Sequence, residues 1–309
     1  MKIFLTGASG LVGSQFARAA AQAGHEVVGV VGTYPHAIAG LAQQLQLDLA
    51  DFGHLASVLR AQGPDAVVNC AAISQPEACD ANPALAQKLN VELPATLARL
   101  AAERGARLVH LSSEQVFDGR RRAAYRLTDR PAPINLYGRQ KVESEEAVHA
   151  AAGDFAATLR APLLMGNSAA GKRSTHERLF LDWMAGRTPK LFTDEYRQPC
   201  TADNLASVML ELCARRDLHG VLHWAGADLI SRHELGRRIR EHFQLTESRA
   251  PLQSATYADV PGAAQKRQAC LALDLAPLVG TVQTKPQTLA RQLAELKVPP
   301  PCQAWYRAV

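Results

Sequence analysis

The stretch Thr6-Gly7-Ala8-Ser9-Gly10-Leu11-Val12-Gly13 decides the fold of this 309-residue chain. Its glycines follow a short apolar run at residues 2–6. They open a second stretch, residues 10–23, whose apolar side chains recur at helical spacing. A glycine-rich turn between a buried strand and a helix is typical of a loop that binds the pyrophosphate of a dinucleotide. The alternative, a tight strand-to-helix turn without a ligand, has much less weight in this context.

Each glycine has a separate task in such a loop. Gly7 permits the tight turn, Gly10 lets the backbone approach the pyrophosphate, and Gly13 lets the helix pack closely on the strand. The N-terminus of the helix then faces the phosphates. We therefore expect a nicotinamide dinucleotide to be held by this loop, through Gly7, Ser9, Gly10, Leu11, Val12 and Gly13.

Short apolar runs alternate with helical patterns along the first half of the chain. Strands are expected at residues 2–6, 26–31, 65–69, 107–112 and 154–160, and helices at 10–23, 52–61, 83–104 and 135–152. Strands that alternate with helices form βαβ units. The pattern predicts an α/β fold, a Rossmann-type doubly wound parallel sheet, with residues 1–160 as the NAD(P)-binding domain.

The pattern changes after Pro162. Residues 166–175 are polar and contain glycine, which suggests a loop that faces a ligand. Helices are expected at 176–185, 202–215, 231–243 and 286–296, and short strands at 190–193, 221–224 and 270–273. Residues 161–309 are thus predicted to form a smaller C-terminal α+β substrate lobe, part of which packs back on the Rossmann domain.

Composition is ordinary for a globular protein. The chain is 47% hydrophobic and 20% charged, with a formal net charge of +5 and a pI near 9.0. Because Lys and Arg are spread along the chain, a nucleic-acid partner is not expected. The modest positive net charge is compatible with a small anionic ligand. The six cysteines include no CxxC motif and no zinc-like spacing, so no metal site is predicted. No signal peptide and no membrane-spanning stretch are visible, which favours a cytoplasmic location and no membrane partner.

The end of the second expected strand bears on the choice of cofactor. An acidic residue there would bind the ribose 2′-hydroxyl of NAD, but residues 30–36 (Val-Val-Gly-Thr-Tyr-Pro-His) contain no carboxylate. NADP(H) is therefore favoured weakly over NAD(H), with Thr33 near the ribose. Asp48, followed by Leu49, is a candidate to hydrogen-bond the adenine amine, and a solvated or helix-capping Asp is an equally weighted alternative.

Tyr137 and Lys141 lie four residues apart and therefore on one face of the helix expected at 135–152. An ammonium near a phenol lowers the phenol's pKa and makes it a usable proton donor. Two serines, Ser112 and Ser113, end the strand expected at 107–112, at the sheet edge where open α/β sheets bind ligands. A hydroxyl there can hold a substrate carbonyl, although a turn-forming serine pair is favoured on local pattern alone.

Together these motifs resemble the extended short-chain dehydrogenases/reductases. The resemblance is carried by the glycine loop, by Asn69-Cys70-Ala71-Ala72, by the run from Ser112 to Gly119 (Ser-Ser-Glu-Gln-Val-Phe-Asp-Gly) and by Tyr137-x-x-x-Lys141. The Val-Phe-Asp-Gly run before Tyr-Gly-x-x-Lys resembles more narrowly the dTDP-4-dehydrorhamnose reductase family. The resemblance covers nearly the whole chain, strongly to about residue 160 and loosely after it. In the second part, Gln198-Pro199-Cys200-Thr201, Asp203 and Ser231-Arg232-His233-Glu234-Leu235 are also similar to that family.

The resemblance implies a Ser-Tyr-Lys site in which hydride passes from NAD(P)H to a ketone. Ser113 would polarise the carbonyl, Tyr137 would donate the proton, and Lys141 would lower its pKa and hold the nicotinamide ribose. It further implies a cofactor-binding role for Cys70, Ala71 and Ala72. The implied substrate is a 4-keto nucleotide-diphosphate sugar, with substrate contacts from Ser74, Glu114, Gln115, Asn167, Arg173 and Arg197.

The chain departs from the family pattern near the substrate. Ser113-Glu114-Gln115 stands where the family usually has Thr-Asp-Tyr, and Leu127 replaces a glutamate. Two other functions therefore stay open. One is an NAD-retaining nucleotide-sugar epimerase or dehydratase, in which Glu114 would serve as the added acid. The other is a non-catalytic NADP-binding regulatory subunit, resembling the β subunit of methionine adenosyltransferase. The resemblance also suggests a possible homodimer through the helices expected at 83–104 and 135–152.

Overall fold

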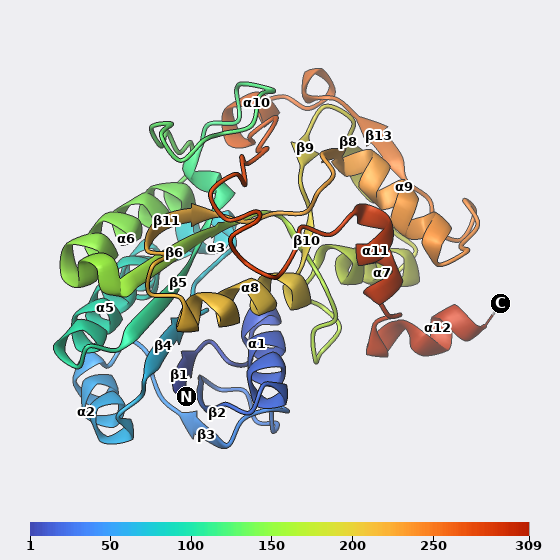
Figure 1. Cartoon of the computed structure of the whole chain (residues 1–309). Coiled ribbons are helices and arrows are strands. Elements are labelled where there is room, and N and C mark those ends of the chain that lie inside the picture. The colour runs from blue at the N-terminus through green and yellow to red at the C-terminus, as the bar shows by residue number, and fades with distance from the viewer. Residues whose placement is uncertain (309) are drawn as a thin grey trace.

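The computed structural model describes residues 1–308, and its centre is a seven-stranded sheet in which every neighbouring pair is parallel (Figure 1). The strands run in the order β11 (Gly220–His223), β6 (Ala156–Ala161), β5 (Arg107–Ser113), β4 (Ala66–Asn69), β1 (Lys2–Thr6), β2 (Glu26–Val31) and β3 (Gln43–Gln46). The order reverses between β1 and β4. The predicted α/β fold with a doubly wound parallel sheet is confirmed, and ligands of such sheets bind at this reversal.

Two helical layers cover the sheet. One face packs on α1 (Leu11–Gln22) and α8 (Ala202–Ala214), and the other on α2 (Phe52–Gln62), α5 (Leu93–Glu103) and α6 (Leu136–Ala152) (Figure 1). The alternation of side chains along β1 sends Ile3 and Leu5 into the first core and Phe4 into the second. Because both faces are buried, β1 has the continuous apolar sequence that marks it as a central strand.

Two features of this half differ from the sequence-based expectation. The polar strand β3 was not predicted, because it lies at the sheet edge, where three glutamines stay largely exposed. The helix expected at 83–104 is broken into α4 (Pro83–Gln87), a π-helical turn (Lys88–Glu92) and α5. Helical periodicity continues through such a turn, so apolar spacing alone does not reveal it.

The second half forms a lobe beside the sheet, with its own core around Phe180, Trp183 and Ile239. Its strand pairs are β7 (Leu164–Met165) with β10 (Cys200–Thr201), β9 (Tyr196–Arg197) with β12 (Ile230–Ser231), and β8 (Lys190–Phe192) with β13 (Gln253–Ala255). Its helices are α7 (Thr175–Met184), α9 (Arg232–His242), α10 (Ala263–Lys266), α11 (Leu289–Glu295) and α12 (Gln303–Arg307). Residues 270–273 make only isolated bridges instead of the expected strand.

The remaining short elements are α3 (Pro76–Ala81) and the 3₁₀ turns Glu114–Val116, Gly153–Phe155, Tyr257–Asp259 and Pro300–Cys302. Two elements from after residue 160 join the first half, since β11 pairs with β6 and α8 packs on α1. Within residues 1–308 no helix has both the length and the apolar character needed to cross a bilayer.

Candidate active site

A cavity of about 450 Å³ lies at the carboxyl ends of the central strands, between the sheet and the second lobe. Residues of the glycine loop and of the loop after β4 form one part of its wall: Gly10, Leu11, Val12, Cys70 and Ala72. Ser113, Tyr137 and Lys141 line the same cavity. The fold therefore brings the glycine loop and the Ser-Tyr-Lys set, more than 100 residues apart in sequence, to one cavity.

The glycine loop has little room for side chains. Gly7 has a φ of +71°, and a Cβ atom there would lie 2.6 Å from the backbone N of Ala71. A Cβ on Gly13 would collide with the carbonyl group of Gly7, which shows how tightly α1 sits on the turn. The N-cap of α1 is Gly10, so no capping side chain occupies the first N–H groups of the helix. This backbone fits the phosphates of a dinucleotide.

The predicted adenosine contacts lie farther along the sheet edge. Thr33 lies two residues after the end of β2, and Asp48 lies two residues after the end of β3, which pairs with it. Both side chains are exposed. The Asp48 carboxylate accepts a hydrogen bond from Ala50 N at 2.9 Å, while Leu49 packs on the core below. None of these residues lines the cavity that holds Tyr137.

The loop after β4 is fixed by a buried amide. Asn69 Oδ1 accepts hydrogen bonds from Thr6 Oγ1 at 2.7 Å and from Ala71 N at 3.1 Å. These bonds tie the turn that contains Cys70 and Ala71 to the end of β1. The turn and the glycine loop are therefore held as one unit, in agreement with the close approach of Gly7 to Ala71.

Tyr137 and Lys141 occupy the first two turns of α6, and both side chains are buried. Asn135 caps this helix by accepting a hydrogen bond from Gly138 N at 2.7 Å. Lys141 Nζ donates to the carbonyl of Leu111 in β5 at 2.8 Å and lies 5.8 Å from the centre of the Tyr137 ring. Ser113 is the last residue of β5, so strand and helix jointly set the three groups.

A buried ion pair supports this arrangement from behind. Arg160 of β6 binds Glu145 of α6 through both ends of the guanidinium, with N–O distances of 2.9 and 2.6 Å. Glu145 also accepts a hydrogen bond from Ser112 Oγ at 2.5 Å. Glu145 lies one turn beyond Lys141, so the pair links α6 to β5 and β6 immediately behind the Ser-Tyr-Lys set.

Burial controls the protonation of this set. Burial raises the pKa of Tyr137, and its hydrogen bond with Ser113 only partly opposes that rise. Burial also lowers the pKa of Lys141 to about 8, against the opposing charge of Glu145. The expected lowering of the phenol's pKa by Lys141 is therefore not seen here, because desolvation of the phenolate is the larger effect. Tyr137 is a protonated phenol at neutral pH.

The residues predicted to bind substrate are not all brought together. Ser74, Glu114, Gln115, Arg173 and Arg197 line the cavity. Arg197 is already engaged, since its Nε lies 3.3 Å from Glu114 Oε1.

Asn167 does not line this cavity but a separate one. Its amide donates to Glu295 O at 2.9 Å and accepts from Lys297 N at 2.8 Å. The side chain is therefore used to hold the C-terminal segment, an interaction that its sequence position does not indicate.

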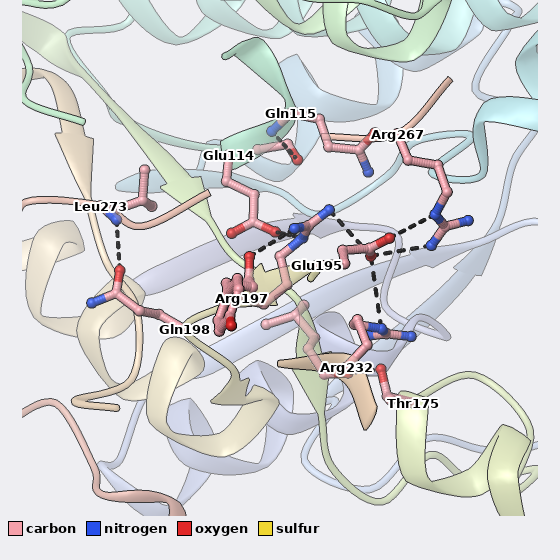
Figure 2. Close-up of polar contacts among 12 residues, drawn as sticks. Glu114, Gln115, Thr175, Glu195, Arg197, Gln198, Arg232, Arg267 and Leu273 are labelled. Atoms are coloured by element: carbon pink, nitrogen blue, oxygen red, sulfur yellow. Dashed lines mark hydrogen bonds and ion pairs between the residues drawn. The ribbon is translucent and has the colours of Figure 1, made fainter. Parts of the chain in front are cut away.

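The second lobe contributes a cluster of charged residues to the cavity wall, of which only Arg197 was predicted as a substrate contact. Glu195 lies among Arg197, Arg232 and Arg267, which come from three separate segments (Figure 2). Arg232 lies in the run Ser231-Arg232-His233-Glu234-Leu235, which carries part of the family resemblance. This run could have identified Arg232 as a candidate site residue. No local pattern marks Glu195 or Arg267 as site residues.

The cavity wall is electropositive. It carries seven Lys and Arg side chains against three Glu side chains. Burial raises the pKa of Glu114 to about 8, although the charge of Arg197 opposes the rise. Such a wall favours an anionic ligand. Among residues 1–308 no group of three or more His, Cys, Asp or Glu side chains is arranged to hold a metal ion.

Comparison with known proteins identifies the family. The family model described as the RmlD substrate binding domain matches residues 1–297. A probable low-salt glycan biosynthesis reductase, Agl14 of Haloferax volcanii, is 33% identical over 96% of this chain and 97% of its own. The methionine adenosyltransferase 2 subunit beta of Pongo abelii is 32% identical over 78% of this chain and 72% of its own.

Solved structures agree with the fold. A hypothetical dTDP-4-dehydrorhamnose reductase from Sulfolobus tokodaii superposes with a TM-score of 0.81 and 30% identity, covering 96% of this chain and all of its own. A Bacillus anthracis dTDP-4-dehydrorhamnose reductase, in complex with NADP, shares the fold at 19% identity and a TM-score of 0.78, over 95% of this chain and 97% of its own. With a family model that spans 297 residues and a relative of 33% identity along nearly the whole chain, this protein belongs to the RmlD substrate binding domain family of the extended short-chain dehydrogenases/reductases.

Proposed function

We propose that the protein reduces a ketone with NAD(P)H, and that the ketone belongs to a 4-keto nucleotide-diphosphate sugar. The observation that carries the proposal is the meeting of the glycine loop with Ser113, Tyr137 and Lys141 around one cavity. The Haloferax volcanii relative, named as a reductase, supports the same reaction class.

The residues divide the reaction into positioning and proton transfer. The bound dinucleotide supplies the hydride for the carbonyl carbon. Ser113 donates a hydrogen bond to the carbonyl oxygen. As the carbonyl group is converted into an alkoxide, Tyr137 transfers its proton to that oxygen. An alkoxide is a stronger base than a phenolate, so a phenol of raised pKa still donates downhill. The hydrogen bond from Lys141 Nζ to the carbonyl of Leu111 holds the ammonium near Tyr137. Its positive charge stabilises the phenolate that remains after proton transfer.

NADP(H) is proposed as the preferred cofactor. The segment after β2 holds no carboxylate that would repel a 2′-phosphate, and the Bacillus anthracis neighbour is a complex with NADP. Thr33 and Asp48 are assigned to the adenosine half because the ends of β2 and β3 lie side by side.

The proposal is tested by cofactor titration followed by turnover. Binding of NADPH and NADH is measured by fluorescence, and a panel of 4-keto nucleotide sugars is then offered with each cofactor. One NADPH consumed per alcohol formed is the expected result. Tight NADPH binding without reduction of any ketone in the panel would contradict the substrate class.

A second function is favoured by two specific observations. Glu114 is a buried carboxyl next to Ser113, and burial raises its pKa to about 8, so it is an acid near neutral pH. An epimerase or dehydratase that retains NAD would use such an acid. Product formation without added cofactor separates this alternative from reduction, which consumes cofactor in equal amount.

A regulatory role is the third possibility, since the Pongo abelii relative is a methionine adenosyltransferase subunit. Co-purification with a methionine adenosyltransferase, together with the absence of ketone reduction, would support it. The intact set of Ser113, Tyr137 and Lys141 argues for catalysis, because a purely regulatory protein has no use for a buried proton donor.

A further inference from the structure

We infer that His110 is a positioning residue, whose neutral imidazole, protonated at Nε2, joins the turn after β4 to the helix that carries Tyr137 and Lys141. Its hydrogen bonds, with those of Thr6, Asn69 and Ser144, form what we call the cross-sheet network. The inference rests on the proposed function for the reaction that the network serves. The direction of its hydrogen bonds follows from the contacts alone.

A row of polar side chains crosses the central sheet where apolar residues would be expected. It consists of register partners from β1, β4, β5 and β6, each no more than 3% exposed: Thr6, Asn69, His110 and Thr158. Two residues earlier on each strand, the same face is part of the apolar core and carries Phe4, Val67, Leu108 and Ala156. A buried imidazole and a buried amide cost free energy unless their donors and acceptors are all paired, so apolar packing does not explain this row.

The hydrogen bonds of Asn69 fix the protonation of the neighbouring imidazole. Ala71 N donates at 3.1 Å to one side-chain atom of Asn69, which must therefore be the oxygen. Thr6 Oγ1 donates to the same oxygen at 2.7 Å. The other side-chain atom, Nδ2, lies 3.1 Å from His110 Nδ1 and can only donate to it. His110 Nδ1 is therefore the acceptor and carries no proton.

The second ring nitrogen extends the network to α6. A neutral imidazole without a proton on Nδ1 carries it on Nε2, and His110 Nε2 lies 3.2 Å from Ser144 Oγ. Ser144 Oγ in turn donates to the carbonyl of Lys141 at 2.8 Å. The network thus begins at the end of β1, where the glycine loop starts, and ends on the turn of α6 that holds Lys141.

The surroundings of His110 keep the ring neutral. Burial lowers the pKa of His110 well below its ordinary value, and the charge of Lys141 lowers it further. A proton on Nδ1 would also point at the Nδ2 donor of Asn69, to which His110 Nδ1 now accepts. Desolvation therefore selects the neutral form, and the hydrogen bonds select one of its two tautomers.

The network adds a contact that links α6 towards β4. Lys141 Nζ is bound to the carbonyl of Leu111 in β5, and Glu145 is bound to Arg160 in β6, which lies on the other side of β5. His110 supplies the link in the direction of the cofactor turn. Because hydride and proton must reach one carbonyl group, the cofactor turn and α6 need a fixed separation, and a displacement of about 1 Å can lower the rate by about 100-fold.

The first test observes the tautomer directly by ¹⁵N NMR of the histidine side chains at neutral pH. The protein has ten histidines, so the His110 signals are assigned by their loss in His110→Gln. The expected result is a proton on Nε2 and none on Nδ1. Ser144→Ala removes the acceptor, so the Nε2 proton should exchange with solvent faster than in the wild type. A proton on Nδ1, or on both nitrogens, overturns the inference.

The second test separates positioning from folding by kinetics. His110→Leu is expected to lower kcat about tenfold with little change in KM, because the substrate contacts remain while the link to α6 is lost. His110→Gln, whose amide can still donate to Ser144, should recover part of kcat. Thr158→Val is the matched control, since Thr158 is the next member of the row and is also buried but takes no part in the network. Its kcat should equal that of the wild type.

The outcomes against the inference are distinct from a failure to fold. A purely structural role would lower the Tm of His110→Leu and leave kcat unchanged, which contradicts positioning. If His110→Leu no longer binds NADPH, Ser144→Ala replaces it, because that variant breaks the same network by removing one hydroxyl. A wild-type kcat in Ser144→Ala then rejects the role of His110. A protein that shows the Nε2 tautomer but reduces no ketone keeps the network and rejects the reductase.

Discussion

At the residue scale, the protonation of a few buried groups controls the chemistry of the cavity. Tyr137, Lys141 and Glu114 are all nearly inaccessible to solvent, and burial is the largest influence on the pKa of each. It favours the neutral form in every case, so the phenol and the Glu114 carboxyl hold their protons more firmly, and Lys141 releases its proton more readily. At neutral pH the site thus presents two protonated acids next to an amine that is still mostly charged.

Tyr137→Phe should lower turnover by about 100-fold or more, since it removes the proton donor while keeping the ring. NADPH affinity should change little, because the glycine loop and Lys141 are untouched. Stopped-flow turnover and a separate NADPH titration measure the two effects. Unchanged turnover in this variant would remove Tyr137 from the role assigned here.

The raised pKa of Glu114 predicts that the free energy of unfolding of the protein depends on pH. Its pKa rises from 4.5 in the unfolded chain to about 8 in the folded protein, so folding favours the protonated form. The resulting stability is fully present below about pH 4.5 and is lost as the pH rises through 8. Glu114→Gln cannot ionise, so its Tm should exceed that of the wild type by about 2–4 °C or more at pH 9. The difference between the two proteins should shrink towards pH 5, as followed by calorimetry; a constant offset across this range would contradict the shifted pKa.

At the element scale, the glycine loop and α1 act as one piece with the turn after β4. Gly13→Val should destabilise the protein and weaken NADPH binding together, because its Cβ would meet the backbone carbonyl of Gly7. We expect a loss of about 1–3 kcal/mol in urea denaturation. Gly53→Ala is the control: it lies in α2, where a Cβ would meet only Asp51 Oδ1 at 3.6 Å, an ordinary contact. Equal stability of Gly13→Val and the wild type would show that the loop is looser than described.

At the scale of the whole molecule, the cavity exists only because two separately packed regions meet. One wall comes from the sheet and α6, and the other comes from β9, α9 and the segment after α10. A ligand that touches both walls binds the folded protein alone and therefore raises the free energy of unfolding. NADPH at 100 times its Kd should add about 2.7 kcal/mol, which thermal unfolding with and without cofactor measures.

The homodimer suggested by the family resemblance remains a prediction at this scale. α5 and α6 pack against each other on one face of the sheet, where they are available to meet the same pair of a second chain (Figure 1). Light scattering should then give twice the chain mass of 33.3 kDa. A monomeric mass at micromolar concentration would reject the dimer.

Sequence alone determined five strands of the central sheet (β1, β2, β4, β5 and β6) and the glycine loop, because each carries a local signature such as an apolar run, a tight turn or a helix start. Tyr137 and Lys141 could be identified from the sequence for the same reason: they lie on one helix, whose pitch places residues four apart on the same face. Only the tertiary structure decided the arginine-lined wall of the cavity and the use of Asn167. Glu195, Arg232 and Arg267 are more than 30 residues from one another, and Asn167 binds the backbone beyond residue 294. Periodicity along a chain reports which face is buried, but it does not report which distant charges will share a cavity.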